Sequence, residues 1–171
     1  LSMGAAPVRP PIPGYDRVRT LRTVEDAARL VSDVDVASST AVVIGGGFIG
    51  LEMAENLGGQ GIDVTIVEAT PQVLPPLDPE LAILVEDELV AHGVHVETGA
   101  TVVSVDDTTV TLADERSLPA ELVVGAIGVR PDVRLAEAAG LELGPSGGIT
   151  VTDTNQTNDP DIYAVGDAVE K

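Results

Sequence analysis

The sequence predicts a three-layer α/β domain built on a parallel sheet, and three observations lead to it. An apolar, β-branched run at residues 41–44 leads directly into the glycine-rich stretch 45–50. A helical pattern follows this stretch, and a second apolar run comes after it at residues 64–67. Two strands joined through a helix form a βαβ unit with parallel strands. Apolar residues make up 44% of the 171 residues, which is enough for one compact domain with a core.

Hydrophobic spacing and turn residues predict the other elements. Helical spacing predicts helices over about residues 24–34, 48–57, 79–92 and 133–139. Short apolar runs predict strands at residues 1–5, 18–21, 41–44, 64–67, 94–97, 122–127, 149–151 and 162–165. The runs at 101–106, 109–112 and 117–119 are separated by acidic turns, and they predict an antiparallel meander in place of a crossover helix. Residues 6–14 and 69–77 are rich in proline and are expected to be loops.

Two helix starts carry recognisable signals. Thr23 and Asp26 resemble a capping box, in which each residue bonds the backbone of the other. Asp78 is expected to cap the third helix, with Pro79 in its first turn and Gly93 at its end.

The glycine-rich stretch has the pattern G-x-G-x-x-G, formed by Gly45, Gly47 and Gly50. The first glycine permits a tight turn, the second lets a pyrophosphate approach the backbone, and the third lets the helix pack against the strand. Phosphates are then expected at the helix N-terminus, where free N–H groups favour negative charge. Glu68 ends the second strand, 18 residues after Gly50, near the roughly 20-residue offset of the acid that binds the ribose hydroxyls. This context indicates a Rossmann-like dinucleotide site rather than a glycine turn without a ligand.

The same acid predicts which dinucleotide is bound. A carboxylate at Glu68 repels a 2′-phosphate, and residues 69–77 contain no Arg or Lys to accept one. We therefore expect NAD(H) rather than NADP(H).

Composition excludes several functions. The net charge of −19 argues against nucleic acid and anionic membranes as partners, and it means that local donors must bind a dinucleotide. The chain has no cysteine, so it contains no thiol chemistry of its own. Without a membrane-spanning apolar run or a signal pattern, we expect a soluble, cytoplasmic protein. His92 and His95 lack a third ligand nearby in sequence, so we expect no metal, and His92 suits a helix C-terminus.

Five motifs, in this order along the chain, together resemble the pyridine nucleotide–disulfide oxidoreductases. They are the connector Gly4-Ala5-Ala6-Pro7 with Pro10-Pro11-Ile12-Pro13-Gly14, then residues 21–27, 45–52, 126–131 and 161–168. Residues 71–80 look most like the NADH oxidase and coenzyme A-disulfide reductase branch, although ferredoxin and rubredoxin reductases share much of the rest. In that family an NAD domain is inserted in an FAD domain, and a dimerisation domain follows.

The resemblance implies that this chain is a piece of a longer enzyme. Residues 15–145 would be the NAD(H)-binding domain, while residues 1–14 and 146–171 would be remnants of the FAD domain. The FAD fingerprint, redox cysteine and dimerisation domain would lie outside it, and the parent would be a homodimer. Its orphan strands would leave apolar edges through which it could self-associate. Those edges would carry Ile12, Ile149, Val151, Ile162 and Val165.

The resemblance also implies residue roles. Phe48 would cover the nicotinamide pocket, with a core residue as the alternative reading, and Glu52 would contact the carboxamide unless it is only a solvated charge. Gly128 would offer backbone contact to the nicotinamide half unless it is a simple turn glycine. Gly166 and Asp167 would belong to the second FAD motif, with Asp167 on the ribityl chain. The candidate cofactor-binding residues are Gly45, Gly47, Phe48, Ile49, Gly50, Glu52, Glu68, Gly128, Gly166 and Asp167.

The parent is therefore expected to pass hydride from NADH to FAD and then electrons to a disulfide or to oxygen. The chain itself offers no general acid, base or nucleophile, so we expect it to bind nucleotide without turnover. Two alternatives remain open at this stage: a component of an NADH-dependent ferredoxin or rubredoxin reductase, and a non-catalytic NAD-binding or redox-sensing module.

Overall fold

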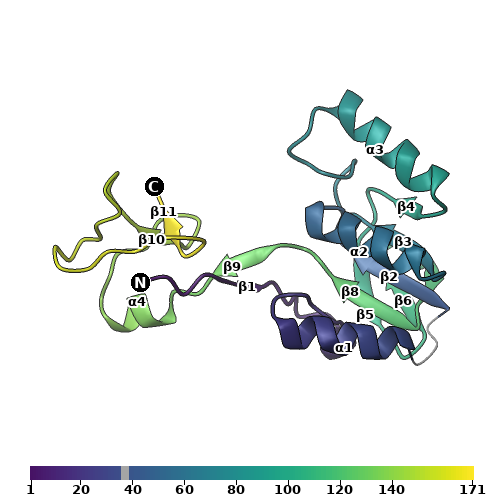
Figure 1. Cartoon of the computed structure of the whole chain (residues 1–171), viewed down its shortest axis with the longest axis horizontal. Helices are drawn as coiled ribbons and strands as arrows, with labels where there is room; N and C mark the ends of the chain where they lie inside the picture. Colours follow the sequence, from purple (N-terminus) through teal and green to yellow (C-terminus); the bar gives the residue numbers. More distant parts are fainter. Residues whose placement is uncertain (36–38) are drawn as a thin grey trace. The chain divides into compact units, whose positions relative to one another are not determined.

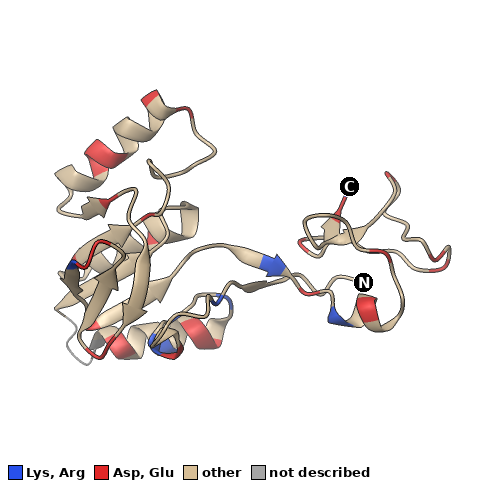
Figure 2. Cartoon of the chain, turned by 180° about the vertical axis from the view of Figure 1, so that it is seen from behind, with Lys and Arg blue, Asp and Glu red and all other residues tan. Residues whose placement is uncertain are grey.

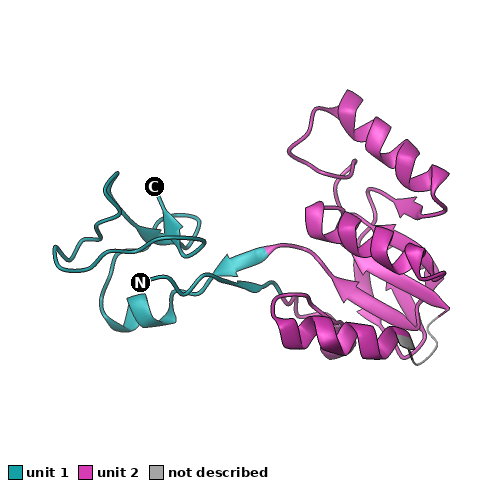
Figure 3. Ribbon diagram, in the orientation of Figure 1, with its two compact units in different colours: residues 1–8, 129–171 teal, residues 9–128 magenta. Residues whose placement is uncertain are grey.

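The computed structural model describes residues 1–35 and 39–171, which form two compact units (Figure 3). Residues 9–128 make the larger unit, and residues 1–8 with 129–171 make the smaller one. Residues 129–145 thus cluster with the terminal segments, although the sequence placed them with the glycine-rich domain. Within the described part of the chain, no helix is long and apolar enough to cross a membrane.

A four-stranded parallel sheet forms the centre of the larger unit (Figure 1). Its strands are β2 (Thr40–Ile44), β3 (Asp63–Val67), β4 (His95–Glu97) and β8 (Leu122–Gly125), and their order across the sheet is β4-β3-β2-β8. The chain adds β3 and β4 on one side of β2 and then crosses to add β8 on the other side. The predicted parallel sheet is confirmed, and the strand order reverses beside β2.

Helices cover one face of this sheet. They are α1 (Val24–Asp35), α2 (Phe48–Gly59) and α3 (Pro79–Ala91). One cluster of buried side chains joins them to the sheet and includes Leu30, Ala41, Val43, Ala54, Leu57, Val64 and Ile66. α3 is the most exposed of the three, with only Ala82 among its residues fully buried.

The two predicted caps have different outcomes. The N–H of Asp26 donates to Thr23 Oγ1 over 3.2 Å, and the N–H of Thr23 donates to Asp26 Oδ2 over 3.0 Å, so the capping box is confirmed. The backbone N–H of Thr23, and less strongly that of Arg22, donates to the carboxylate of Asp26 and lowers its pKa below the ordinary value. The predicted side-chain cap by Asp78 is wrong: Asp78 occupies the N-cap position, but its carboxylate makes no capping bond. The expected proline follows it in the first turn.

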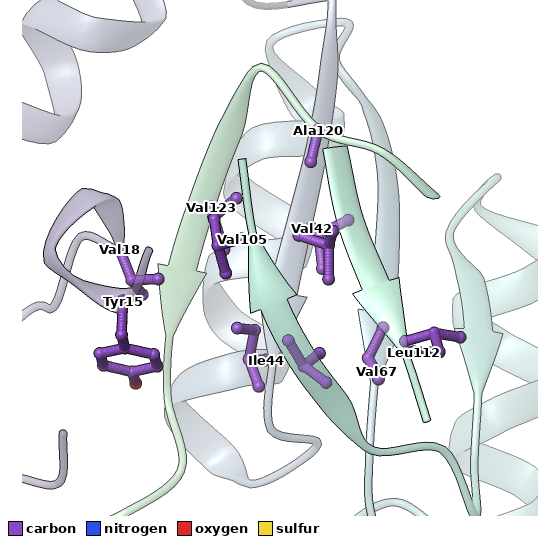
Figure 4. Packing of buried hydrophobic residues seen from close by; sticks show 11 residues of the cluster. Tyr15, Val18, Val42, Ile44, Val67, Val105, Leu112, Ala120 and Val123 are labelled. Carbon is purple, nitrogen blue, oxygen red and sulfur yellow. The ribbon is translucent and has the colours of Figure 1, made fainter. Parts of the chain in front are cut away.

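An antiparallel meander covers the other face of the sheet. Its strands are β5 (Val102–Val105), β6 (Thr109–Leu112) and β7 (Ser117–Pro119), and they confirm the predicted replacement of a crossover helix. Figure 4 shows the apolar side chains packed between the two layers. They include Tyr15, Val42, Ile44, Val67, Val105, Leu112 and Val123. Alternate residues of β2 thus serve opposite cores, which is what a strand buried on both faces requires.

The predicted strand at 18–21 is absent. The short helix η1 (Tyr15–Arg17) precedes this segment, and only an isolated bridge between Arg19 and Val124 pairs it with β8. Tyr15 and Val18 turn into the meander core, so this segment is fixed by burial rather than by a ladder of backbone bonds.

As the structure describes it, the smaller unit contains two short strand pairs and one helix. β1 (Ala5–Pro7) pairs antiparallel with β9 (Val129–Pro131), and β10 (Ile149–Thr150) pairs parallel with β11 (Val169–Glu170). The helix α4 (Arg134–Ala138) matches the predicted one.

The predicted strand at 162–165 is wrong. The N–H of Ala164 donates to the carbonyl of Asn155, and that of Val165 donates to the carbonyl of Leu1. The N–H of Thr157 also donates to the carbonyl of Ile162, so the segment makes only an isolated antiparallel bridge, between Tyr163 and Gln156, and no strand forms. Two residues of the expected apolar edge are covered, because Ile149 pairs with Val169 of β11 and is fully buried, and Val151 is buried as well, whereas Val165 is exposed.

Candidate nucleotide-binding site

The candidate residues of the larger unit gather at the carboxyl ends of β2 and β8. The N–H of Gly45 donates to the carbonyl of Val67 over 2.8 Å, and the N–H of Ala126 donates to that of Ile44 over 2.7 Å. These bonds continue the sheet one residue beyond its strands and fix the two loops that leave it. Because the strand order reverses between β2 and β8, this edge is where open parallel sheets bind ligands.

The three glycines of the pattern meet different surroundings. Gly45 has φ +109°, and a Cβ on it would stand 2.5 Å from the carbonyl oxygen of Ala126. A Cβ on Gly50 would stand 1.9 Å from the carbonyl oxygen of Gly45. Gly45 is therefore required by the close approach of the loop after β8, and Gly50 by the close approach of α2 to the glycine turn. A Cβ on Gly47 would meet nothing within 4 Å, so the fold leaves open space there.

The first turn of α2 has unused hydrogen-bond donors. Gly47 is the N-cap residue, so no side chain caps the helix, and its first turn contains no acid. The first helical bond at this end runs from the N–H of Leu51 to the carbonyl of Gly47. Within the described residues, the N–H groups of Phe48, Ile49 and Gly50 have no acceptor. Free donors and the positive end of the helix dipole are features that favour an anion at a helix N-terminus.

Glu68 lies beside this turn and is only 8% exposed. Its Oε2 accepts a 2.6 Å hydrogen bond from the N–H of Gly46, and its Oε1 accepts one of 2.7 Å from the N–H of Thr70. A carboxylate has about four lone-pair sites, so it can still accept hydroxyl donors. The predicted acid is thus positioned next to the glycine turn.

Sequence reasoning missed Gly46 and Leu74. The carbonyl of Gly46 accepts a 2.8 Å bond from the N–H of Leu74, so Gly46 joins the glycine turn to both Glu68 and the following loop. A Cβ on Gly46 would stand 3.2 Å from side-chain atoms of Glu68 and Val73, which is a tight contact. The available signal for Gly46 was that it is an additional glycine between Gly45 and Gly47, the first two glycines of the pattern. No spacing rule marks Leu74, because its contact is made through the backbone.

Phe48 and Glu52 lie on the same side of α2, as their i,i+4 spacing predicted. Both line a groove of about 830 Å³ between α2 and α3, together with side chains that include Leu84, Leu89 and His92. Phe48 is 70% exposed, which contradicts its alternative reading as a core residue. Ile49 is 49% exposed beside it, and Glu52 is exposed.

The remaining candidates are all open to solvent. Gly128 follows β8 with φ +94°, and a Cβ on it would meet nothing within 4 Å. Gly166, with φ +82°, and the exposed Asp167 belong to the smaller unit. The larger unit therefore assembles all the candidates except these two.

Acidic side chains dominate both units (Figure 2). His92 Nδ1 lies 2.9 Å from the carbonyl oxygen of Glu88 at the end of α3, in keeping with the predicted helix-terminal contact. His95 Nε2 lies 3.3 Å from Asp63 Oδ1. No group of three or more potential ligands for a metal occurs among residues 1–35 and 39–171.

Known proteins share this sequence and fold. An NADH oxidase of Methanocaldococcus jannaschii is 39% identical over 99% of this chain, which covers 39% of that protein. The crystal structure of reduced CoADR-RHD from Bacillus anthracis is 42% identical, with a TM-score of 0.95 over 99% of this chain and 31% of the other.

A second pair of structures is informative about nucleotides. The water-forming NADH oxidase of Lactobacillus brevis, solved with NADH, is 32% identical, with a TM-score of 0.91 over 98% of this chain and 38% of the other. An engineered variant of that enzyme carries five substitutions and was solved with NADPH. It is 30% identical, with a TM-score of 0.92 over the same shares of the two chains.

This chain spans between about a third and two fifths of the length of these proteins. The family model for pyridine nucleotide-disulphide oxidoreductases matches residues 1–171, the whole of the chain. Members of that family bind NAD(H) and FAD. From its sequence, its sheet and its glycine turn together, the chain belongs to the pyridine nucleotide-disulphide oxidoreductase family.

Proposed function

We propose that this chain is the NAD(H)-binding part of a flavoprotein oxidoreductase that passes hydride from NADH to FAD and then electrons to a disulfide or to oxygen. The observation that carries the proposal is the first turn of α2. There, three backbone N–H groups lack acceptors, and Gly47 leaves open space in front of them. A pyrophosphate supplies the acceptors that these donors lack.

The residues present suit the other parts of NADH. Glu68 retains acceptor sites for ribose hydroxyls beside the turn that would hold the phosphates. Phe48 is exposed at the same helix start, where it can cover a nicotinamide ring, and Glu52 follows one turn later. Gly128 lies in the loop after β8, and a Cβ on it would meet nothing within 4 Å, so its backbone is accessible to a ligand. The bound NADH supplies the hydride, while these residues hold and orient it.

NADH is proposed over NADPH because of Glu68. A buried carboxylate at the ribose position disfavours a 2′-phosphate. The engineered NADPH oxidase supports this choice, because its five substitutions include one of a glycine and one of an aspartate that lie 18 positions apart. Gly50 and Glu68 have the same separation here, and an alanine follows the acid in both chains.

The chain contains no residue that we propose as a catalyst. With no cysteine, it can neither form nor break a disulfide, and electron transfer to the final acceptor would need the rest of the protein. We propose that Gly166 and Asp167 contribute to the FAD site of that longer protein. An FAD domain and a dimerisation domain would be its other parts, and the longer protein would be a homodimer.

A titration tests the proposal. The chain has no Trp, so nicotinamide fluorescence can be followed with little protein background. We expect saturable binding of NADH, much weaker binding of NADPH, and no reduction of added FAD beyond the uncatalysed rate. Equal binding of the two nucleotides would refute the role of Glu68. Absence of binding would refute the nucleotide site, and catalysed FAD reduction would refute the assignment as a binding part only.

A further inference from the structure

The loop between β3 and α3, residues 69–77, is anchored at two adjacent peptide groups. The N–H of Leu74 donates to the carbonyl of Gly46 over 2.8 Å. The N–H of Val73 donates to Oε1 of Glu86, on α3, over 3.1 Å. Val73 is fully buried and Leu74 is 6% exposed, so water does not readily replace either bond.

The backbone of Leu74 needs this support. Its φ is +46°, in the left-handed region that residues with a side chain rarely adopt. Such a conformation persists only where its surroundings hold it in place. The carboxylate of Glu86 is the side-chain contact that holds the residue immediately before it.

The anchored loop borders the acid of the proposed nucleotide site. It leaves β3 directly at Glu68, whose carboxylate accepts the N–H of Thr70, and it returns to Gly46, whose N–H donates to the same carboxylate. Gly46 is thus hydrogen-bonded to both Glu68 and Leu74, and these two bonds tie both ends of segment 68–74 to the glycine turn. A shift of the loop would therefore move both the glycine turn and the acid.

We infer that Glu86 is a positioning residue for the adenosine-ribose side of the nucleotide site, where it fixes the loop that orients Gly46 and Glu68. This inference rests on the proposed function. Glu86 is half-buried and acts through Val73 rather than by touching the nucleotide. A purely structural brace would lower stability alone, whereas a positioning residue also changes the affinity for the adenosine half.

Three variants separate these roles. Glu86→Ala removes the acceptor, Glu86→Gln keeps a side-chain oxygen that can accept from Val73, and Asp87→Ala removes the next acid of α3, which is exposed and makes no bond to the loop. Alanine and glutamine are both good helix formers, so α3 itself is preserved. Each variant is titrated with NADH and with ADP-ribose, which lacks the nicotinamide half. Hydrogen exchange of the Val73 and Leu74 amides is measured in the same proteins.

We expect Glu86→Ala to lower the affinity for NADH and for ADP-ribose about fivefold, which is within the range that the loss of a single hydrogen bond produces. We also expect faster hydrogen exchange at the amides of Val73 and Leu74. Glu86→Gln and Asp87→Ala should stay within about twofold of the wild type. Wild-type affinity in Glu86→Ala, or a loss confined to NADH, would overturn the inference while the proposed function stands. A wild-type chain that binds neither ligand would overturn the proposed function, and this inference with it.

Discussion

The Oε2 atom of Glu68 accepts a 2.6 Å hydrogen bond from the N–H of Gly46, which joins the end of β3 to the glycine turn after β2. The acid therefore has two tasks in our account. It satisfies a buried backbone donor of the turn, and it presents its remaining lone pairs to the ribose. Variants of Glu68 should affect both stability and cofactor choice.

The double variant Glu68→Ala/Ala69→Arg should reverse the cofactor preference. It removes the carboxylate that repels a 2′-phosphate and adds a guanidinium that can donate hydrogen bonds to that phosphate. The ratio of NADPH to NADH affinity should rise by more than about tenfold. The double variant should also lower the free energy of unfolding by about 1–3 kcal/mol, because the N–H groups of Gly46 and Thr70 lose their acceptor.

Fluorescence titration and urea unfolding measure the two effects, and Glu55→Ala, an exposed acid of α2, is the control. An unchanged affinity ratio in the double variant would show that Glu68 does not select the nucleotide.

Gly45→Ala should mainly lower stability, whereas Gly47→Ala should mainly lower the affinity for NADH. Gly45→Ala brings a Cβ against the carbonyl of Ala126 at φ +109°, and it should lower the free energy of unfolding by at least about 2 kcal/mol. Gly47→Ala has room, so it should change stability by less than about 0.5 kcal/mol. Gly47→Ala should nevertheless lower the affinity for NADH by about tenfold or more, because the new methyl group occupies the space proposed for the pyrophosphate.

Gly58→Ala is the matched control, since this α2 glycine has nothing within 4 Å of a Cβ. It should raise stability by about 0.5–1 kcal/mol and leave NADH binding unchanged. Normal NADH affinity in Gly47→Ala would argue against phosphate binding at this turn.

Phe48→Ala should leave the fold intact. The ring is 70% exposed, so its loss should change the free energy of unfolding by less than about 0.5 kcal/mol, whereas a buried Phe would cost about 3–5 kcal/mol. Urea unfolding distinguishes the two cases. A loss in the larger range would mean that Phe48 is packed in solution and is not available to cover a nicotinamide.

Stability should fall as pH rises above about 10, and Tyr15 should be a cause. Burial raises the pKa of its hydroxyl, an effect that the charge of Arg9 partly offsets. The unfolded chain therefore ionises Tyr15 at a lower pH than the folded chain does, so the folded state is favoured below the unfolded pKa and loses that advantage as pH increases. Urea midpoints between pH 8 and pH 11 would show this decline. It should be smaller in Tyr15→Phe and unchanged in Tyr163→Phe, whose ring is half exposed.

The sequence predicted the parts of this fold that depend on local patterns. Short apolar runs and helical spacing located the helices and most strands of the larger unit, and the capping box at Thr23 formed as expected. The segments at 18–21 and 162–165 were predicted to be strands but make only isolated bridges, because apolar, β-branched composition does not say how far a pairing extends along the chain.

The candidate site was predictable where it follows from glycine chemistry. Gly45, Gly47 and Gly50 have steric surroundings that match the roles expected from their pattern. Leu74 and Glu86 could not be found in this way, because Leu74 bonds Gly46 through its backbone and Glu86 accepts from the backbone of Val73, which lies in another element. Such contacts depend on tertiary structure and leave no spacing signal.

The most direct test of the account is the response of the α2 amides to NADH. In the ¹⁵N-labelled chain, the amide signals of Phe48, Ile49 and Gly50 should shift on titration with NADH and saturate together with the fluorescence change, because their free N–H groups receive the phosphates. The amide signals of Asp78 and Glu80, at the start of α3, should not shift. Saturable binding that shifts other amides and leaves these three unchanged would contradict the assignment of the nucleotide to this turn.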